Sequence, residues 1–156
     1  MPNTYNLRIE TPLSVEQVTG VAAKANNITL KDNKSPISFS VDYVFVVGVE
    51  SPNNKITRQV YLEEYDFIPT VNLTFEHGYT IDANIVNPII ARTVSAVLKE
   101  VQGNAVFLYN SEEIKLKRIN DTLIVDKSRY YDWLAEGLSE ANIEYKRQEI
   151  NNPALV

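Results

Sequence analysis

The sequence predicts a single α+β domain, with a mostly antiparallel sheet of about five to seven strands and about three helices packed mainly on one face. Two observations support this prediction. The chain opens with an alternating strand followed by a capped helix, and a later helix leads into an antiparallel hairpin over residues 87–126. A chain that begins with a strand followed by a helix is not typical of a closed barrel or a sandwich. At 156 residues, 44% of them hydrophobic, the chain can bury one substantial core, so we expect one domain over residues 1–150.

The first two elements have local signals. Residues 4–11 alternate apolar and polar side chains, which is typical of a half-buried strand. Ser14 and Gln17 are spaced as a capping box at the start of a helix. An apolar stripe follows, and residues 26–27, both Asn, are suited to end this helix.

Extended segments are predicted through the middle of the chain. Residues 37–49 are rich in β-branched and aromatic side chains, which favours one strand that passes from the sheet edge to its interior. A turn then leads into residues 55–62, predicted as the returning strand. Residues 63–69 fit one helical turn or an exposed loop. Residues 71–76 alternate again and predict a half-buried strand, and residues 77–79 are expected to turn out of it.

A helix is predicted over residues 88–102. Asn87 is suited to cap it, and Pro88 fits its first position, where no backbone N–H is needed. Apolar residues recur at the spacing of one helical face. Gly103 is suited to end the helix in the left-handed conformation.

A hairpin is predicted to follow this helix. Residues 105–109 are nearly all apolar, which indicates a central strand covered on both faces. After a turn at residues 110–111, Ile114 and Leu116 alternate with lysines, so we expect one buried and one exposed face in the next strand. A second turn at residues 120–121 leads into a third strand.

The last predicted helix begins near Ser128, which is suited to cap it. Tyr130 and Trp133 fall on its apolar face and are expected in the core, whereas Tyr131 is expected to be exposed. Residues 151–156 are expected to form a frayed tail.

The composition limits the kinds of partner that the protein is expected to bind. The formal net charge is −5 and the pI is about 4.9, so the surface is expected to repel nucleic acid and anionic membranes and to attract a basic partner. We find no apolar run long enough to cross a bilayer and no N-terminal secretory signal. The sequence has no cysteine, which agrees with the reducing cytosol. A cytoplasmic location is therefore expected.

We predict no catalytic residue, no metal ligand and no cofactor. His77 is the single histidine, which removes most catalytic triads and histidine metal sites. Glu76 and Asp82 lie near it, but Glu76 and His77 are neighbours on a strand and should point to opposite faces. The sequence also lacks a phosphate-binding loop and a nucleophile elbow.

Two clusters would suit a protein interface. In residues 61–67 aromatic side chains stand among carboxylates, and Tyr130, Tyr131 and Trp133 form a second, aromatic cluster. The carboxylates would steer a basic partner, and an exposed ring would anchor it. The candidate partner-binding residues are Glu63, Glu64, Tyr65, Asp66 and Tyr131. The alternative is that the rings near the first set, Tyr61 and Phe67, enter the core while the carboxylates face water.

Residues 89–118 resemble small bacterial immunity proteins of contact-dependent and swarm-type polymorphic toxin systems. The shared features are a helix ending in Gly, a small polar residue, a short apolar strand that leads to Asn, and a strand rich in Leu and basic residues. Here these are Gly103, Asn104, residues 105–108, Asn110 and residues 116–118. Asn104 stands where that pattern more usually has Asp. The resemblance implies a non-catalytic immunity protein that binds a cognate toxin domain and neutralises it by occluding its active site or another surface.

Two other classes of function stay open. A small-ligand-binding or regulatory domain would need an apolar pocket, which we place between helix 88–102 and the sheet. A carboxylate-dependent enzyme would use pairs such as Glu76 with Asp82 or Glu63 with Asp66. A toxin gene beside this one would favour the immunity protein, and a metabolic operon would favour the other two.

Overall fold

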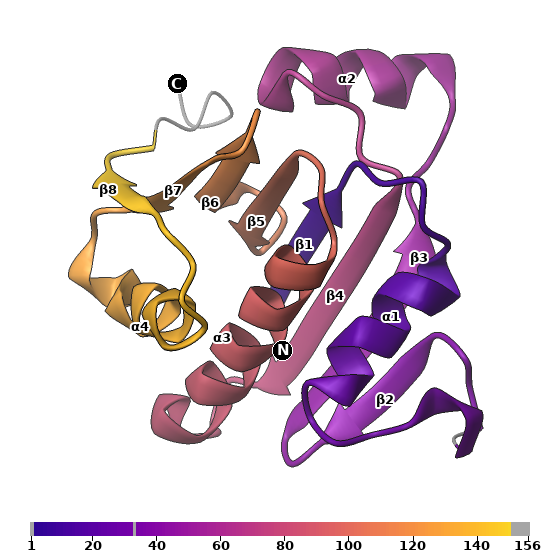
Figure 1. Ribbon diagram of the computed structural model, residues 1–156, viewed down its shortest axis with the longest axis vertical. Coiled ribbons are helices and arrows are strands. Elements are labelled where there is room, and N and C mark those ends of the chain that lie inside the picture. The colour runs from indigo at the N-terminus through magenta and orange to yellow at the C-terminus, as the bar shows by residue number, and fades with distance from the viewer. Residues whose placement is uncertain (1, 33, 151–156) are drawn as a thin grey trace.

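An eight-stranded sheet runs through the part of the chain that the computed structural model describes, residues 2–32 and 34–150 (Figure 1). Its spatial order is β2 (Ser38–Val41), β3 (Val44–Glu50), β4 (Val71–Gly78), β1 (Pro2–Ile9), β5 (Ala105–Tyr109), β6 (Glu113–Ile119), β7 (Thr122–Asp126) and β8 (Lys146–Gln148). Neighbouring strands are antiparallel except β7 and β8, which are parallel. The α+β class is confirmed, with more strands than expected. The predicted tail, residues 151–156, lies outside the described residues.

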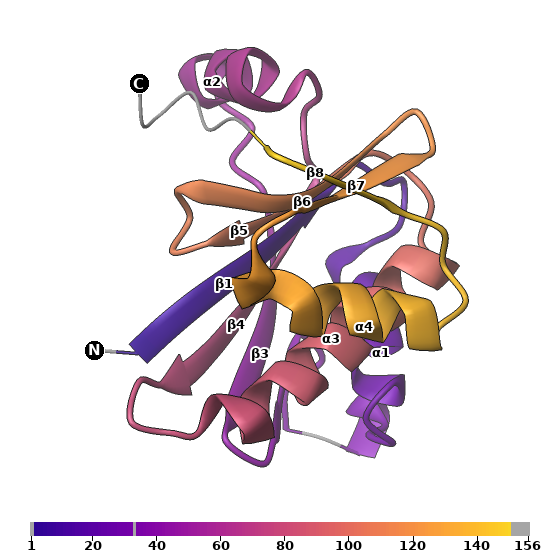
Figure 2. The same ribbon diagram turned by 90° about the vertical axis from the view of Figure 1, so that its left-hand side faces the viewer.

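Three helices cover one face of the sheet, which we call the inner face, and a fourth lies on the outer face (Figure 2). The inner helices are α1 (Val15–Lys24), α3 (Ala83–Glu100) and α4 (Asp132–Glu140), and the outer one is α2 (Lys55–Tyr65). The predicted packing of helices mainly on one face is therefore correct. Short 3₁₀ turns occur at Leu30–Asp32 and Arg129–Tyr131.

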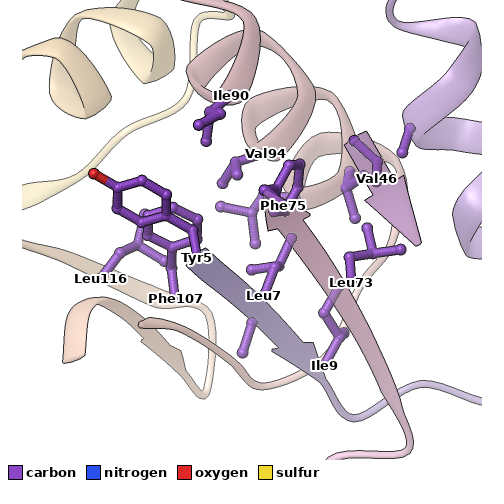
Figure 3. Packing of buried hydrophobic residues seen from close by; sticks show 14 of the residues in the cluster. Tyr5, Leu7, Ile9, Val46, Leu73, Phe75, Ile90, Val94, Phe107 and Leu116 are labelled. Atoms are coloured by element: carbon purple, nitrogen blue, oxygen red, sulfur yellow. The ribbon is translucent and has the colours of Figure 1, made fainter. Parts of the chain in front are cut away.

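The main core lies between the sheet and the inner helices (Figure 3). Burying a large apolar side chain completely is worth about 1.5–3 kcal/mol, so this layer supplies most of the favourable free energy of folding. Its labelled members include Leu7, Leu73, Phe75, Ile90, Val94, Phe107 and Leu116. A smaller second core lies on the outer face and consists of Tyr61, Tyr65, Phe67, Val106, Leu108, Ile114 and Ile150. Residues 105–109 are thus covered on both faces, as predicted.

Helices and turns whose sequence signals lie within a few neighbouring residues form at the positions that the sequence predicts. The Ser14 hydroxyl accepts a hydrogen bond from the Gln17 backbone N–H at 3.1 Å, and the Gln17 side chain accepts one from the Ser14 N–H at 2.9 Å. Both hairpin turns use two successive residues with positive φ, as tight two-residue hairpins require. These residues are Asn110 (52°), Ser111 (61°), Asn120 (49°) and Asp121 (68°).

The predicted strand over residues 55–62 is wrong, because this segment belongs to helix α2. The Asn54 side chain accepts a hydrogen bond from the Thr57 N–H and so caps the helix. The buried residues of α2, Tyr61 and Tyr65, are four positions apart, the spacing of one helical face. The signal for a helix in the sequence was Asn54, a residue suited to cap a helix directly before Lys55.

Residues 37–49 form a hairpin instead of one strand. Asp42 takes a left-handed conformation with φ of 48° and turns β2 back onto β3. Because Asp is one of the few residues that tolerate this conformation, the Asp42 position marks the turn within an otherwise strand-like run. β2 is the edge strand, and β3 lies beside it toward the sheet interior.

Helix α3 begins earlier than predicted. Asp82, and not Asn87, caps it by accepting a hydrogen bond from the Asn84 N–H, so Pro88 lies inside the helix. The helix ends at Glu100, before Gly103. Gly103 has φ of 124°, and a Cβ there would lie 1.9 Å from the carbonyl oxygen of Glu10. Gly103 therefore permits a close backbone contact, rather than ending the helix.

The second strand of the hairpin does not have one buried and one exposed face. The register between β5 and β6 shifts, so that Phe107 pairs with Leu116 and Leu108 pairs with Ile114. This bulge places Leu116 in the main core and Ile114 in the second core, on the opposite face. An alternating sequence pattern cannot reveal such a shift, because every residue beyond the bulge points to the opposite face of the sheet.

Two aromatic predictions at the last helix are also wrong. Ser128 caps the 3₁₀ turn rather than α4, which begins at Asp132. The tighter turn shifts the helical phase, so Tyr130 is exposed and Tyr131 packs against the main core. Trp133 is partly buried against that core, in agreement with its predicted place.

Candidate interaction surface

Helix α2 is attached to the rest of the protein along one narrow face. It lies at one end of the molecule, on the outer side of the sheet (Figures 1 and 2). The rings of Tyr61 and Tyr65 stack at a centroid distance of 5.8 Å, and Phe67 lies 5.9 Å from Tyr65. These rings cover the outward-facing apolar residues of β5 and β6, so α2 is fixed by an aromatic contact.

Arg8 of β1 holds this aromatic contact in place. Its Nη1 donates a 2.6 Å hydrogen bond to the Tyr65 hydroxyl, and its Nε donates one of 3.4 Å to the Asn72 side chain. The guanidinium carbon lies 5.8 Å and 5.9 Å from the ring centroids of Tyr61 and Tyr65. Burial raises the pKa of Tyr65 above its ordinary value, while the positive charge of Arg8 acts to lower it. The neutral phenol is therefore the form that packs here.

The remaining surface of α2 combines exposed apolar side chains with carboxylates. Ile56 is 78% exposed, and Val60 and Leu62 are also exposed. The exposed carboxylates are Glu63, Glu64 and Asp66. In the described part of the chain, none of the three forms an ion pair, although Gln59 donates a hydrogen bond to Glu63. We call these six residues, Ile56, Val60, Leu62, Glu63, Glu64 and Asp66, the α2 surface.

The structure brings three of the five candidate residues together. Glu63, Glu64 and Asp66 share the α2 surface, and their role in binding stays a prediction. Tyr65 is 5% exposed and bonded to Arg8, so its ring cannot be an exposed anchor. Tyr61 and Phe67 lie in the second core while the carboxylates face water, as the alternative interpretation expected. Sequence reasoning missed the exposed Ile56, Val60 and Leu62, because a strand would bury them.

Tyr131 belongs to a different region. Its ring lies 6.0 Å from that of Trp133, and the Lys115 Nζ is 5.0 Å from the Tyr131 ring centroid. Burial, with smaller contributions from Tyr5 and Glu113, raises the pKa of Tyr131 well above its ordinary value. Since Tyr131 packs on the inner side of the sheet, it is not part of the α2 surface.

The candidate catalytic residues Glu76 and His77 do not point to a common site. Glu76 and His77 alternate along β4, and His77 is buried with its ring 6.2 Å from that of Tyr5. His77 is thus a strand residue, and not the turn residue that we predicted. Within residues 2–32 and 34–150 no three His, Asp or Glu side chains are grouped so as to hold a metal ion.

A groove of about 530 Å³ is lined mainly by residues of α3 and α4. A ligand pocket was predicted between α3 and the sheet, where apolar side chains fill the space instead. The Oγ of Ser95, which lines the groove, is buried without a hydrogen-bond partner in the described structure. The groove lining includes Pro88, Ala91, Arg92, Ser95, Lys99, Trp133, Glu136, Gly137 and Glu140.

A family model described as SitI3-like matches residues 3–136. Families named SitI are immunity proteins of polymorphic toxin systems. No curated protein and no solved structure matches the chain. No helix in the described residues is long and apolar enough to cross a membrane. Because the match covers most of the sequence, the chain belongs to the SitI3-like family.

Proposed function

We propose that this member of the SitI3-like family is a non-catalytic immunity protein, which binds a cognate toxin domain and neutralises it by occluding its active site or a surface it needs. The family match over residues 3–136 carries this proposal. The resemblance of residues 89–118 to small bacterial immunity proteins indicates the same class of protein.

The α2 surface supports a stoichiometric complex with a basic partner. Three carboxylates without ion pairs in the described structure raise the local negative potential, which speeds the approach of a positively charged domain. The exposed side chains of Ile56, Val60 and Leu62 can then be buried at the contact. We expect a cytoplasmic complex, in which the on-rate falls as salt rises.

A small-ligand-binding role is the second candidate function, and the groove between α3 and α4 is the observation that favours it. Trp133 and Pro88 offer apolar contact to a ligand. The Ser95 hydroxyl, which has no hydrogen-bond partner in the described structure, offers a polar contact. Carboxylate catalysis gains no comparable support, because Glu63 and Asp66 are both exposed on α2.

The test is a binding time course against the toxin-like protein encoded beside this gene, at two salt concentrations. The variant combines Glu63→Lys, Glu64→Lys and Asp66→Asn. Asp66 is replaced by Asn because its φ is 66°, a conformation that Asn tolerates. The matched control combines Glu136→Lys, Glu140→Lys and Glu144→Gln, which changes the net charge equally at exposed positions outside the α2 surface.

We expect the α2 variant to associate at least about tenfold more slowly at low salt, with an unchanged melting temperature, because exposed charges contribute little to folding. The control should associate like the parent. An absence of any complex with the parent protein would contradict the immunity function. Equal slowing in both variants would show that net charge, and not the α2 surface, steers the toxin.

A further inference from the structure

The second core covers only half of the outer sheet face. One row across the sheet runs from Val49 through Asn72 and Arg8 to Val106, since these residues are register partners. Val106 is 1% exposed beneath α2, whereas Val49 at the other end of the row is 43% exposed. The cover therefore ends at β1, where Arg8 bonds Tyr65, and the outer face of β2, β3 and β4 stays open.

The open half of this face is apolar along β3. Phe45 is 40% exposed and Tyr43, in the turn before β3, is 58% exposed. The inner side of the same strand is fully buried at Val44 and Val46. A strand that is apolar on both sides is normally covered on both sides, and contiguous exposed apolar side chains mark interaction sites. We call Tyr43, Phe45, Val47 and Val49 the β3 patch.

The surroundings of the β3 patch carry negative charge. Glu76 is the register partner of Phe45, and Asp42 lies in the turn before β3. Neither carboxylate forms an ion pair in the described structure. Arg8, which borders the open half-face on β1, is already bound by Tyr65 and Asn72. The open half-face thus offers apolar contact within a negative field.

Polar side chains between the β3 patch and Arg8 are fixed by one another. Thr74 donates a 3.1 Å hydrogen bond to the Asn6 side chain, and Asn72 donates one of 2.9 Å to Thr74. Asn6 also donates to the Ser111 hydroxyl at 2.8 Å. Because the partly exposed side chains of Asn72 and Thr74 are already ordered, a partner that covers them loses little conformational entropy there.

We propose that the basic toxin domain covers the β3 patch as a second part of its contact surface, on the same outer side of the sheet as α2. This inference rests on the proposed function. The toxin brings positively charged groups toward Glu76 and Asp42 and an apolar group onto Phe45 and Val49. A second copy of this chain fits less well, because a twofold contact places the same carboxylates opposite one another.

The experiment compares two double variants of the full chain in binding to the same adjacent toxin. Phe45→Ala with Val49→Ala removes the β3 patch side chains. The matched control is Ile85→Ala with Tyr130→Ala, whose side chains are 44% and 86% exposed on α3 and the 3₁₀ turn. We expect the β3 variant to leave the complex at least about tenfold faster at an unchanged on-rate, since apolar contacts act mainly on dissociation.

The outcomes separate the inference from the function. If the parent binds the toxin and the β3 variant dissociates like the parent, the β3 patch lies outside the contact surface and the inference fails while the function stands. If the parent does not bind, both fail. The mass of the free protein in solution is measured in parallel. If the parent is a dimer, the β3 variant is a monomer and toxin binding is unchanged, the β3 patch binds a second copy of this chain and the inference fails. Melting temperatures confirm that both double variants fold.

Discussion

The two faces of the sheet are covered in different ways. On the inner face, α3 contributes nine buried residues, among them Ile90, Val94 and Val97, whereas α2 on the outer face contributes two, Tyr61 and Tyr65. Many aliphatic contacts hold α3, and two stacked rings with one guanidinium hold α2. The inner face therefore decides whether the chain folds, and the outer face leaves side chains free for a partner.

The largest expected effect is that of Val97→Asp on the inner face. Val97 is fully buried on α3, so an aspartate there places a charge in the main core, at a cost on the order of 5 kcal/mol, comparable with the whole stability of a domain. We expect no soluble folded protein, as judged by expression and circular dichroism. Ile56→Asp on α2 is the control and should melt like the parent. A Val97→Asp protein that melts normally would show that α3 is not held as described.

The next effect is expected at Tyr65, where α2 joins the outer face. Tyr65→Ala removes a buried ring from the second core and leaves Arg8 without its hydroxyl acceptor, so the free energy of unfolding should fall by about 2–4 kcal/mol. Tyr65→Phe removes the hydrogen bond alone and should cost about 1 kcal/mol. Urea unfolding measures both, and hydrogen exchange should show faster opening in α2 than in α3. Equal protection of α2 in the parent and Tyr65→Ala would contradict this account.

The difference between the faces also explains which elements the sequence could predict. The capping box of Ser14 with Gln17 and the turn at Asn110 and Ser111 are complete within a few residues, so these elements were predicted correctly. The apolar stripe of α3 was recognised because the inner core buries it. Its first residue was missed because Asn87-Pro88 imitates a helix start, although Asp82 supplies the actual cap.

The outer face depends on contacts that are distant in sequence. Tyr65 is buried because Arg8, 57 positions earlier, lies beneath it, and no local pattern encodes that. The shifted register at Phe107 and Leu108 sends Ile114 to the outer core, which an alternating pattern cannot show. The carboxylates of the candidate site were predicted correctly as exposed, but the apolar half of the α2 surface was not.

A smaller effect concerns pH and lies on the inner face. Burial, with the nearby Tyr109, raises the pKa of Tyr5 from 10.0 to about 12. The folded state therefore holds this proton more tightly than the unfolded chain does. The stabilisation is complete below pH 10 and is lost as the pH rises toward 12. Between pH 10 and 12 the melting temperature of Tyr5→Phe should fall less than that of the parent, each measured relative to its value at pH 8. If both melting temperatures fell equally, groups other than Tyr5 would be responsible for the loss of stability at high pH.

The smallest effect on stability is expected at Phe45, which makes the sharpest contrast with Phe75. Both phenylalanines belong to neighbouring strands of one sheet, but Phe75 points into the main core and Phe45 points outward. Phe75→Ala should cost about 3–5 kcal/mol by leaving a cavity. Phe45→Ala leaves none, since solvent already reaches the ring, and should cost less than about 1 kcal/mol in urea unfolding. If the two costs were equal, another part of the chain would cover the β3 patch, and no partner could reach it. A small cost at Phe45 together with a fast loss of toxin would mean that this ring serves binding rather than folding.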